Sequence, residues 1–386
     1  MNKCFITKLP SSVDNDNLPV LGQLRINWLK QSDLTDNGAR AIGLATNDSI
    51  TVKVSGAHLT DSTLASNFGN TKTITAADNE VWLYVSNDAD AVLTIDNKYS
   101  LTELNFVKSE GNYNLKRSVY FDLADIKYCS NIKVLRLSNT QVNGDISDIS
   151  NITNLYNLAL NNTSISGDIS IVSNFTKLES LRIGGTKISG DISAISKLTN
   201  LVFLALGSSK ISGDISAVRN LTRLSILDLQ KTQVSGDISA VSKLINLTEL
   251  YLMNNPISGD IANLANLTKL GDILQLSGMS LIGDVSKIPV SVTTMMYYNR
   301  PINTNFTWTA NGRQNTKFLA MIQNIPFDTA SMDNMLIDQA TCTFEGTNEP
   351  WTKTISVSGT RTSASDAAVA ALQNKGVTII GVTKQA

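Results

Sequence analysis

One pattern of apolar and polar positions repeats through the middle of the chain. Each copy has the form L-x-x-L-x-L-x-x-T-x-I-x-G-D-I-S, as in residues 178–193. Its Gly-Asp pair returns after 23 residues five times and then after 24, and self-similarity at such a period predicts a solenoid of stacked coils. The pairs are Gly144-Asp145, Gly167-Asp168, Gly190-Asp191, Gly213-Asp214, Gly236-Asp237, Gly259-Asp260 and Gly283-Asp284.

The L-x-L part of each copy predicts a short β-strand. Alternation puts its two apolar residues inside and the residue between them outside. Stacked strands then form one parallel sheet, at about 4.8 Å per coil. A coil of 23 residues leaves little room for a full α-helix on the outer side, so short 3₁₀ or extended segments are expected there. Glycine suits the corner conformation, and the aspartate beside it is placed to accept backbone N–H bonds.

Period, leucine spacing and polar position together resemble the leucine-rich repeat family. The resemblance implies an α/β leucine-rich-repeat solenoid with a parallel β-sheet on its concave face. With degenerate copies at 101–106 and 292–297, the sequence predicts about nine coils of 23 residues. The family usually has asparagine at the polar position; hydroxyl residues dominate here, and we expect them to form a ladder from coil to coil because a hydroxyl donates and accepts. The ladder comprises Thr140, Thr163, Thr186, Ser209, Thr232 and Asn255.

The segments on either side of the repeats lack the pattern and predict end structures for the solenoid. Residues 1–98 alternate in the β manner at 50–54, 81–85 and 91–95, which predicts a small N-terminal β domain. Residues 99–310 form the predicted solenoid and residues 311–386 an α/β C-terminal cap. In the cap we expect a helix at 332–340 capped by Ser331, a strand at 354–357, a capping box from Ser363, a helix at 367–375 and a strand at 377–380.

Charge and cysteine content narrow the function classes. The formal charge is −1 and only 17% of residues are charged, so no field for binding nucleic acid is expected. Cys4, Cys129 and Cys342 are too far apart in sequence for a disulfide framework or a C-x-x-C site, and each is expected to be a small buried residue. The first ten residues lack a signal peptide and no run of 18 apolar residues occurs, so a soluble protein made without export is expected.

Catalytic chemistry is not indicated by the sequence. His58 is the only histidine, and there is no G-x-S-x-G elbow, phosphate loop, dinucleotide fingerprint or H-E-x-x-H motif. No pair of acidic residues is singled out for glycoside hydrolysis. We therefore expect no enzyme activity and no cofactor.

The repeated aspartates form the first candidate site. Stacking would place Asp145, Asp168, Asp191, Asp214, Asp237 and Asp260 in a column with neighbours about 5 Å apart, with Asp284 one coil further. Calcium would relieve the repulsion between them, whereas backbone capping would hold each carboxylate separately. Calcium needs six to eight oxygens, and each coil offers one carboxylate followed by Ile and mostly Ser, so capping is favoured and no metal is expected.

The outward positions of the strands form the second candidate site. Phe203, Ile226, Tyr251 and Met253 fall on adjacent coils, and a stripe of apolar groups on a solvent face usually marks a contact surface. The alternative is that a loop of this chain or a neighbouring copy covers it. The predicted ligand-binding residues on this concave face are Arg136, Arg182, Phe203, Ile226, Asp228, Tyr251 and Met253.

The opening of the chain adds a further resemblance. Residues 5–24 are similar to leucine-rich repeat proteins of gut Bacteroidetes bacteria and their phages. With the Ser-, Thr- and Asn-rich composition, this favours a phage virion surface protein, a fibre or decoration, whose N-terminal domain contacts the virion or self-associates. Its solenoid would bind a host-surface protein or glycan. The alternative is a bacterial leucine-rich-repeat scaffold or adhesion protein in the cytoplasm, mediating protein–protein interaction. Neither nucleic acid nor membrane is expected as a partner.

Overall fold

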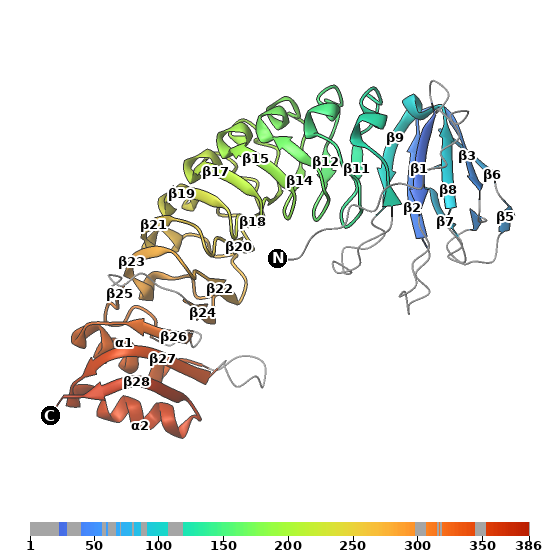
Figure 1. Cartoon of the computed structure of the whole chain (residues 1–386). Helices are drawn as coiled ribbons and strands as arrows, with labels where there is room; N and C mark the ends of the chain where they lie inside the picture. Colours follow the sequence, from blue (N-terminus) through green and yellow to red (C-terminus); the bar gives the residue numbers. More distant parts are fainter. Residues whose placement is uncertain are drawn as a thin grey trace, which may run out of the picture.

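The protein is an arc of stacked coils with a sheet structure at either end (Figure 1). A computed structural model describes residues 23–28, 40–55, 59–60, 67–69, 71–78, 81–85, 91–106, 119–297, 306–314, 316, 319–343 and 353–385. The N-terminal strands lie at one end of the arc and the C-terminal helices at the other. His58, Cys4 and the opening segment 5–22 lie outside the described residues, so their predictions stay untested.

One sheet of 16 strands runs from end to end of the arc. Its middle consists of short strands, one from each coil, each hydrogen-bonded in parallel to the next with no slip in register. The strands of this run are β9 (Leu101–Asn105), β11 (Val134–Arg136), β12 (Asn157–Ala159), β14 (Ser180–Arg182), β16 (Phe203–Ala205), β18 (Ile226–Asp228), β20 (Glu249–Tyr251), β22 (Ile273–Gln275) and β24 (Thr294–Met296). This confirms the predicted parallel sheet.

The repeated apolar positions build the core of each coil. In the coil of β14, Leu178, Leu181, Ile183, Ile188 and Ile192 are all fully buried. Burying one such side chain contributes about 1.5–3 kcal/mol. The coils from β11 to β22 repeat this set, so the core is a continuous apolar column whose members pack on the coils before and after.

The outer side of each coil carries a short 3₁₀ helix, as the 23-residue period predicts. These helices are Leu123–Ile126, Ile146–Ile149, Ile169–Asn174, Ile192–Ile195, Ile215–Val218, Ile238–Val241, Ile261–Leu264 and Val285–Lys287. Extended segments, which were also expected, come mostly just before these helices in the chain, and they join into a second parallel sheet of seven strands that the sequence analysis did not foresee. It comprises β13 (Ser166–Asp168), β15 (Lys187–Asp191), β17 (Lys210–Asp214), β19 (Gln233–Asp237), β21 (Ile257–Asp260), β23 (Ser280–Asp284) and β25 (Phe306–Thr307).

Antiparallel strands form the N-terminal end, where three strands lie at the predicted positions. A five-stranded sheet has the order β10-β1-β8-β3-β6, and β2-β7-β4-β5 extends the main sheet. β9 joins the two kinds of structure, because it pairs antiparallel with β2 and parallel with β11. The strands are β1 (Leu24–Trp28), β2 (Arg40–Thr46), β3 (Ser49–Ser55), β4 (Leu59–Thr60), β5 (Asn67–Gly69), β6 (Thr71–Thr75), β7 (Val81–Val85), β8 (Ala91–Asp96) and β10 (Val119–Tyr120).

At the C-terminal end the main sheet continues with longer parallel strands connected by helices. In chain order these are β26 (Ala320–Pro326), α1 (Thr329–Thr341), β27 (Thr354–Arg361), α2 (Asp366–Asn374) and β28 (Thr378–Lys384). β26 pairs with β24 of the last coil, so the sheet passes without a break into this unit. The division of the chain at residues 98 and 310 stays a prediction.

Two predicted helix caps in this unit are wrong. Helix α1 begins earlier than predicted, and its cap is Asp328, which accepts a hydrogen bond from the N–H of Ser331 at 2.8 Å. The predicted capping box from Ser363 is instead a 3₁₀ turn capped by Thr362. Ser365, at the start of α2, makes no cap and donates its hydroxyl to Asp333 instead. The Ser365 hydroxyl bonds the carboxylate of Asp333, which is 32 residues away, and local spacing does not reveal this contact.

The described cysteines are small buried residues, as predicted. Cys129 and Cys342 are both buried and unlinked, and burial raises the pKa of Cys129 to about 11. Within the described residues, no helix is long and apolar enough to span a membrane.

Candidate binding site on the concave face

The aspartate column caps the 3₁₀ helices. In each coil the carboxylate accepts the backbone N–H two residues later; Ser193 donates to Asp191 at 2.8 Å and Ser216 to Asp214 at 2.7 Å. Asp122 caps the first 3₁₀ helix in the same way, although no glycine precedes it. Hydrogen bonds from the following serines lower the pKa of Asp168, Asp191, Asp214 and Asp237 from its usual value. The capping interpretation is thus confirmed, and Asp284 in addition accepts the backbone N–H of Thr309 at 3.2 Å and the Thr309 hydroxyl.

The carboxylate of one coil lies directly against the glycine of the next. A Cβ atom added to Gly213 would stand 2.7 Å from Oδ1 of Asp191, and Gly213 has a φ of +101°. Glycine is required there because a side chain would meet the carboxylate and because the backbone is in the left-handed region. This explains why glycine and aspartate recur as a pair.

The hydroxyl ladder differs from the prediction. Thr140, Thr163 and Thr186 each donate to the carbonyl three residues earlier in their own coil, at 2.6–2.7 Å, rather than to the next coil. Thr232 makes the same local bond and also reaches Asn255 of the next coil at 2.8 Å. A hydroxyl is too short to satisfy its own turn and span a coil spacing, whereas the Asn255 amide is long enough.

No metal group accompanies the column in the part of the chain that the structure describes, where no three His, Cys, Asp or Glu side chains are close enough to hold an ion. Since each carboxylate is already engaged by a backbone N–H, we predict that the melting midpoint is the same in millimolar calcium and in excess chelator. A calcium-dependent rise of several degrees would contradict the capping interpretation.

The concave face of the main sheet carries the predicted binding residues in three columns. The register aligns Phe203 with Ile226 and Glu249 in one column, and Arg182, Ala205, Asp228 and Tyr251 in the next. Met253 follows β20 in a third column. The four apolar residues predicted as one stripe are therefore spread diagonally over three columns. All seven predicted residues are partly accessible: Arg136, Arg182, Phe203, Ile226, Asp228, Tyr251 and Met253.

A further exposed apolar residue belongs to this face and escaped the sequence analysis. Ile273, on β22, is 51% exposed and pairs with Thr294 on β24. Gln275 aligns with Tyr251, which places Ile273 in the column of Phe203 and Ile226. Ile273 belongs to the coil of 24 residues, so counting 23 residues from the previous coil points to the residue before it. Aligning that coil on its L-x-L segment instead of on Gly-Asp would have found it.

Phe203 is covered on one face by an arginine. The guanidinium carbon of Arg182 lies 3.8 Å from the Phe203 ring centroid, a cation–π distance. The two residues lie on neighbouring strands, diagonally across columns. The pair is partly exposed and carries its positive charge over one face of the ring.

Asp228 is a half-buried carboxylate on the same face. Its hydrogen bonds come from the backbone N–H of Gln230 at 3.0 Å and from the Gln230 amide at 3.3 Å. A Cβ atom added to Gly207 would stand 2.7 Å from Oδ1 of Asp228, so the Asp228 carboxylate packs against the backbone of the neighbouring coil. Burial raises the pKa of Asp228. Beside it, the hydroxyl of Tyr251 donates to Glu249 at 3.1 Å.

Three buried polar atoms of the first coils have no hydrogen bond within the part of the chain that the structure describes. Among the described residues, the buried Arg136 Nε, Asn157 Oδ1 and Ser180 Oγ accept or donate no hydrogen bond. Asn157 is only 8% exposed. The strand alternation puts all three on the concave face, around Ala159 on β12. Buried polar groups normally have partners, so this group is chemically unsatisfied.

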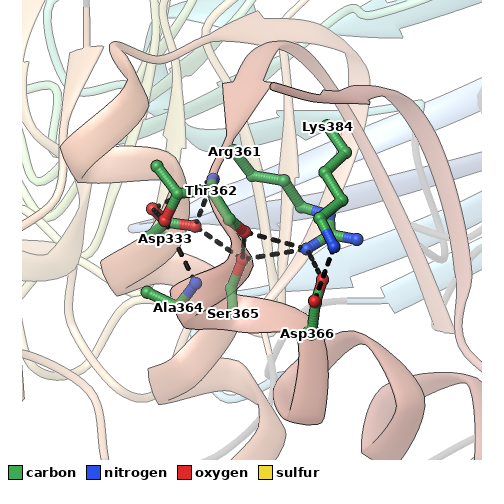
Figure 2. Close-up of polar contacts among 7 residues, drawn as sticks. All are labelled: Asp333, Arg361, Thr362, Ala364, Ser365, Asp366 and Lys384. Carbon is green, nitrogen blue, oxygen red and sulfur yellow. Dashed lines mark hydrogen bonds and ion pairs between the residues drawn. The ribbon is translucent and has the colours of Figure 1, made fainter. Parts of the chain in front are cut away.

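The C-terminal unit holds a second polar cluster, shown in Figure 2. Asp333 of α1 accepts the hydroxyls of Ser365 at 2.5 Å and Thr362 at 2.7 Å, while Arg361 pairs with Asp366 at 2.6 Å. Burial works to raise the pKa of Asp333, but the bonds from Ser365 and Thr362 outweigh it and hold the pKa below its usual value. Ser365 is fully buried, so the cluster joins α1 to the β27–α2 connection rather than presenting a nucleophile.

Comparison with known proteins supports the fold. No protein-family model matches the sequence, and no curated protein is similar in sequence. Among solved structures, an internalin of Listeria monocytogenes matches with a TM-score of 0.50 and 21% identity, over 75% of this chain and 84% of the internalin. The leucine-rich-repeat ectodomain of the plant receptor kinase GASSHO1/SCHENGEN3 from Arabidopsis thaliana, in complex with CASPARIAN STRIP INTEGRITY FACTOR 2, has a TM-score of 0.47 and 21% identity. That match covers 68% of this chain, which spans only 36% of the ectodomain. The internalin match, together with the stacked parallel strands, shows that the chain has the fold of an α/β leucine-rich-repeat solenoid.

Proposed function

We propose that the protein is a non-enzymatic binding protein whose concave face holds an extended segment of a protein partner. The observation that carries the proposal is the group of partly exposed apolar side chains on this face, Phe203, Ile226, Tyr251 and Ile273. They project from strands whose register is fixed by a continuous sheet, so a ligand meets a preformed surface. Aromatic and apolar anchors of this kind dominate the energy of protein interfaces.

A protein ligand suits this surface better than a glycan. Sugars stack on open aromatic faces, but one face of Phe203 is covered by Arg182 and the Tyr251 hydroxyl is engaged by Glu249. The spread of apolar groups over several strands instead suits a chain with side chains at regular intervals.

Site-specific photo-crosslinking tests the proposal. A photo-reactive residue placed at Ile226 should capture a polypeptide from the natural host's surface extract, and the product should disappear when Phe203→Asp is added. The control position is Lys210, which is exposed on the second sheet at β17. Capture only from Lys210, or binding to a glycan array that Phe203→Asp abolishes, would overturn the proposal.

We further propose that the partner is on a host cell and that this chain lies on a virion surface, with the N-terminal strands contacting the particle or another copy. The support is the composition and the opening segment of the sequence. A bacterial leucine-rich-repeat adhesion or scaffold protein is equally compatible with the fold. Light scattering on the full chain separates the two, since a virion protein should form a defined oligomer or co-sediment with particles. A monomer that does neither favours the bacterial alternative.

A further inference from the structure

The formal charge of −1 hides a basic edge along the arc. This basic edge consists of the seven segments that lead from a 3₁₀ helix into the strands β11 to β22, at residues 127–133, 150–156, 175–179, 196–202, 219–225, 242–248 and 265–272. Together they contain eight lysines and arginines but only two acidic residues, Glu179 and Asp272. The repeated aspartates cap the other ends of the 3₁₀ helices, so the coils separate positive from negative charge.

Three cations of the basic edge are held in a ladder with asparagines. In each rung a cation donates to the Oδ1 of an asparagine one coil earlier, and that asparagine donates its Nδ2 to a backbone carbonyl one coil earlier still, at 3.0 to 3.3 Å. The rungs are Lys177 to Asn154 at 2.7 Å, Arg223 to Asn200 at 3.1 Å and Lys269 to Asn246 at 2.8 Å. The ladder thus fixes one cation on every second coil.

The ladder cations present positive charge at a regular spacing. Lys177, Arg223 and Lys269 are exposed, and their hydrogen-bond acceptors are neutral amides. Within the part of the chain that the structure describes, none of the three pairs with a carboxylate. Neighbouring ladder cations are two coils apart, or about 10 Å at one strand spacing per coil. The edge therefore offers a row of separate charges to an anionic polymer.

Hydroxyl and amide groups occupy the positions between these charges. The residue just before each rung position is an exposed threonine in five coils, namely Thr153, Thr176, Thr199, Thr222 and Thr268. Ile245 takes this place in one further coil. Hydroxyls donate and accept hydrogen bonds, and amides do both through separate atoms. Such a surface suits a ligand that is itself rich in hydroxyl groups.

We propose that the basic edge binds an anionic polysaccharide, whose sugars carry acidic groups at intervals. The polymer lies along the arc, its acidic groups pair with Lys177, Arg223 and Lys269, and its hydroxyls bond the threonines and asparagines between them. This site lies beside the concave face and uses none of the residues on which the proposed function rests.

The charge spacing favours a polysaccharide over other anionic polymers. A single nucleic acid strand carries a phosphate about every 3.4 Å, roughly three times as densely as the ladder cations are placed. An extended peptide turns every second side chain to one side, which gives a repeat of about 6.6 Å. A polysaccharide with one carboxylate in every second sugar has a sparser charge, with hydroxyl groups between the carboxylates.

Binding of the full chain to immobilised hyaluronan, which has one carboxylate in every second sugar, tests the proposal. The protein should bind at low ionic strength and dissociate as salt is added. The ladder variant Lys177→Gln/Arg223→Gln/Lys269→Gln should bind about tenfold more weakly or worse, with a shallower dependence on salt.

A second triple variant is the matched control. Lys187→Gln/Lys210→Gln/Lys231→Gln makes the same change in net charge, but it removes exposed cations at or just before the start of strands of the second sheet. Its affinity for hyaluronan should equal that of the unchanged chain. Equal losses in the two triple variants, or no binding of the unchanged chain at low ionic strength, would overturn the inference.

Two further measurements separate this inference from its alternatives. At physiological ionic strength, tighter binding to poly(dT) or to polyglutamate than to hyaluronan, lost in the ladder variant, would give the edge to another class of partner and overturn the inference. Phe203→Asp should leave hyaluronan binding unchanged, so the proposed function can fail while this inference stands. A loss of hyaluronan binding in Phe203→Asp as large as in the ladder variant would overturn the separate site.

Discussion

Aspartates accept hydrogen bonds both in the coils and in the C-terminal unit, but the donors are close in sequence in the coils and distant in the C-terminal unit. In the coils they are mostly exposed, and each accepts the backbone N–H two residues later. In the C-terminal unit Asp338 is buried and accepts bonds from Trp308, Asn311 and Arg313, at 2.8, 3.1 and 3.3 Å. The first contact is local and repeated; the second is distant in sequence and occurs once. Loss of one repeated contact therefore affects one coil, whereas loss of the single cluster affects the end of the solenoid.

The largest effect is expected from Asp338→Ala. Removing the carboxylate leaves the Trp308 indole N–H and two backbone N–H groups without their acceptor, where at least Trp308 and Arg313 are buried. At about 1–3 kcal/mol per unsatisfied group, the free energy of unfolding should fall by about 3 kcal/mol or more. Urea denaturation followed by circular dichroism measures the change. Asp338→Asn keeps one acceptor oxygen, so its free energy of unfolding should fall clearly less than that of Asp338→Ala. Equal decreases for the two variants would argue against the hydrogen-bond explanation.

Gly213→Ala should have an intermediate effect. The new Cβ would press on the Asp191 carboxylate in a backbone conformation that costs about 1–3 kcal/mol for other residues. Gly271→Ala is the control, because its Cβ would meet nothing closer than a carbonyl at 3.4 Å. Thermal unfolding of the two variants should separate them by several degrees. Equal melting temperatures for Gly213→Ala and Gly271→Ala would contradict the explanation given for the Gly-Asp pair.

Asp214→Ala tests the repeated contact itself. It removes one cap from a 3₁₀ helix, and replacing such caps costs about 1 kcal/mol. Asp214→Asn, which can still accept the Ser216 N–H, should be nearly neutral in the same denaturation experiment. A loss as large as that of Asp338→Ala would remove the distinction between the two regions.

The smallest effect concerns pH and the concave face. Burial raises the pKa of Asp228, so folding favours its protonated form; that contribution is complete below the unfolded pKa and is lost as pH rises through the folded value. For Asp237 the pKa is lowered by bonds from Ser239, so its contribution exists above the unfolded pKa and is lost as pH falls through the folded one. Asp228→Asn should therefore raise the melting temperature at pH 7 and leave it unchanged at pH 3. Asp237→Asn should not raise it at pH 7.

The coils were predictable because each one repeats the same short-range rules. Leucine alternation determined the strands, and the 23-residue period excluded long outer helices. Even the capping role of the aspartates followed from their position beside glycine. The hydroxyl ladder was mispredicted because hydroxyl donors select the nearest carbonyl, three residues back, over one in another coil.

The helix caps of the C-terminal unit and the arrangement of residues on the concave face could not be predicted from the sequence. The predicted caps were wrong because Asp328 caps α1 in place of Ser331 and Thr362 caps the turn that begins at Ser363. No spacing in the sequence pairs Asp333 with Ser365. On the concave face the residues were found, but the four apolar ones were taken as one stripe, whereas they occupy three successive positions along their strands and so form a diagonal. Asn157 was not among the predicted binding residues, since the burial of its side chain is visible only in three dimensions.

The unbroken main sheet has a mechanical consequence. A pull between the two ends of the arc acts across successive coils in series, so each coil-to-coil interface, with its hydrogen bonds in both parallel sheets, carries the whole load. Under such a pull the hydrogen bonds between coils break one interface after another at low force, instead of all together as in shear. Under tension the solenoid therefore lengthens in steps, one coil at a time, while the coils that have not yet separated keep their structure.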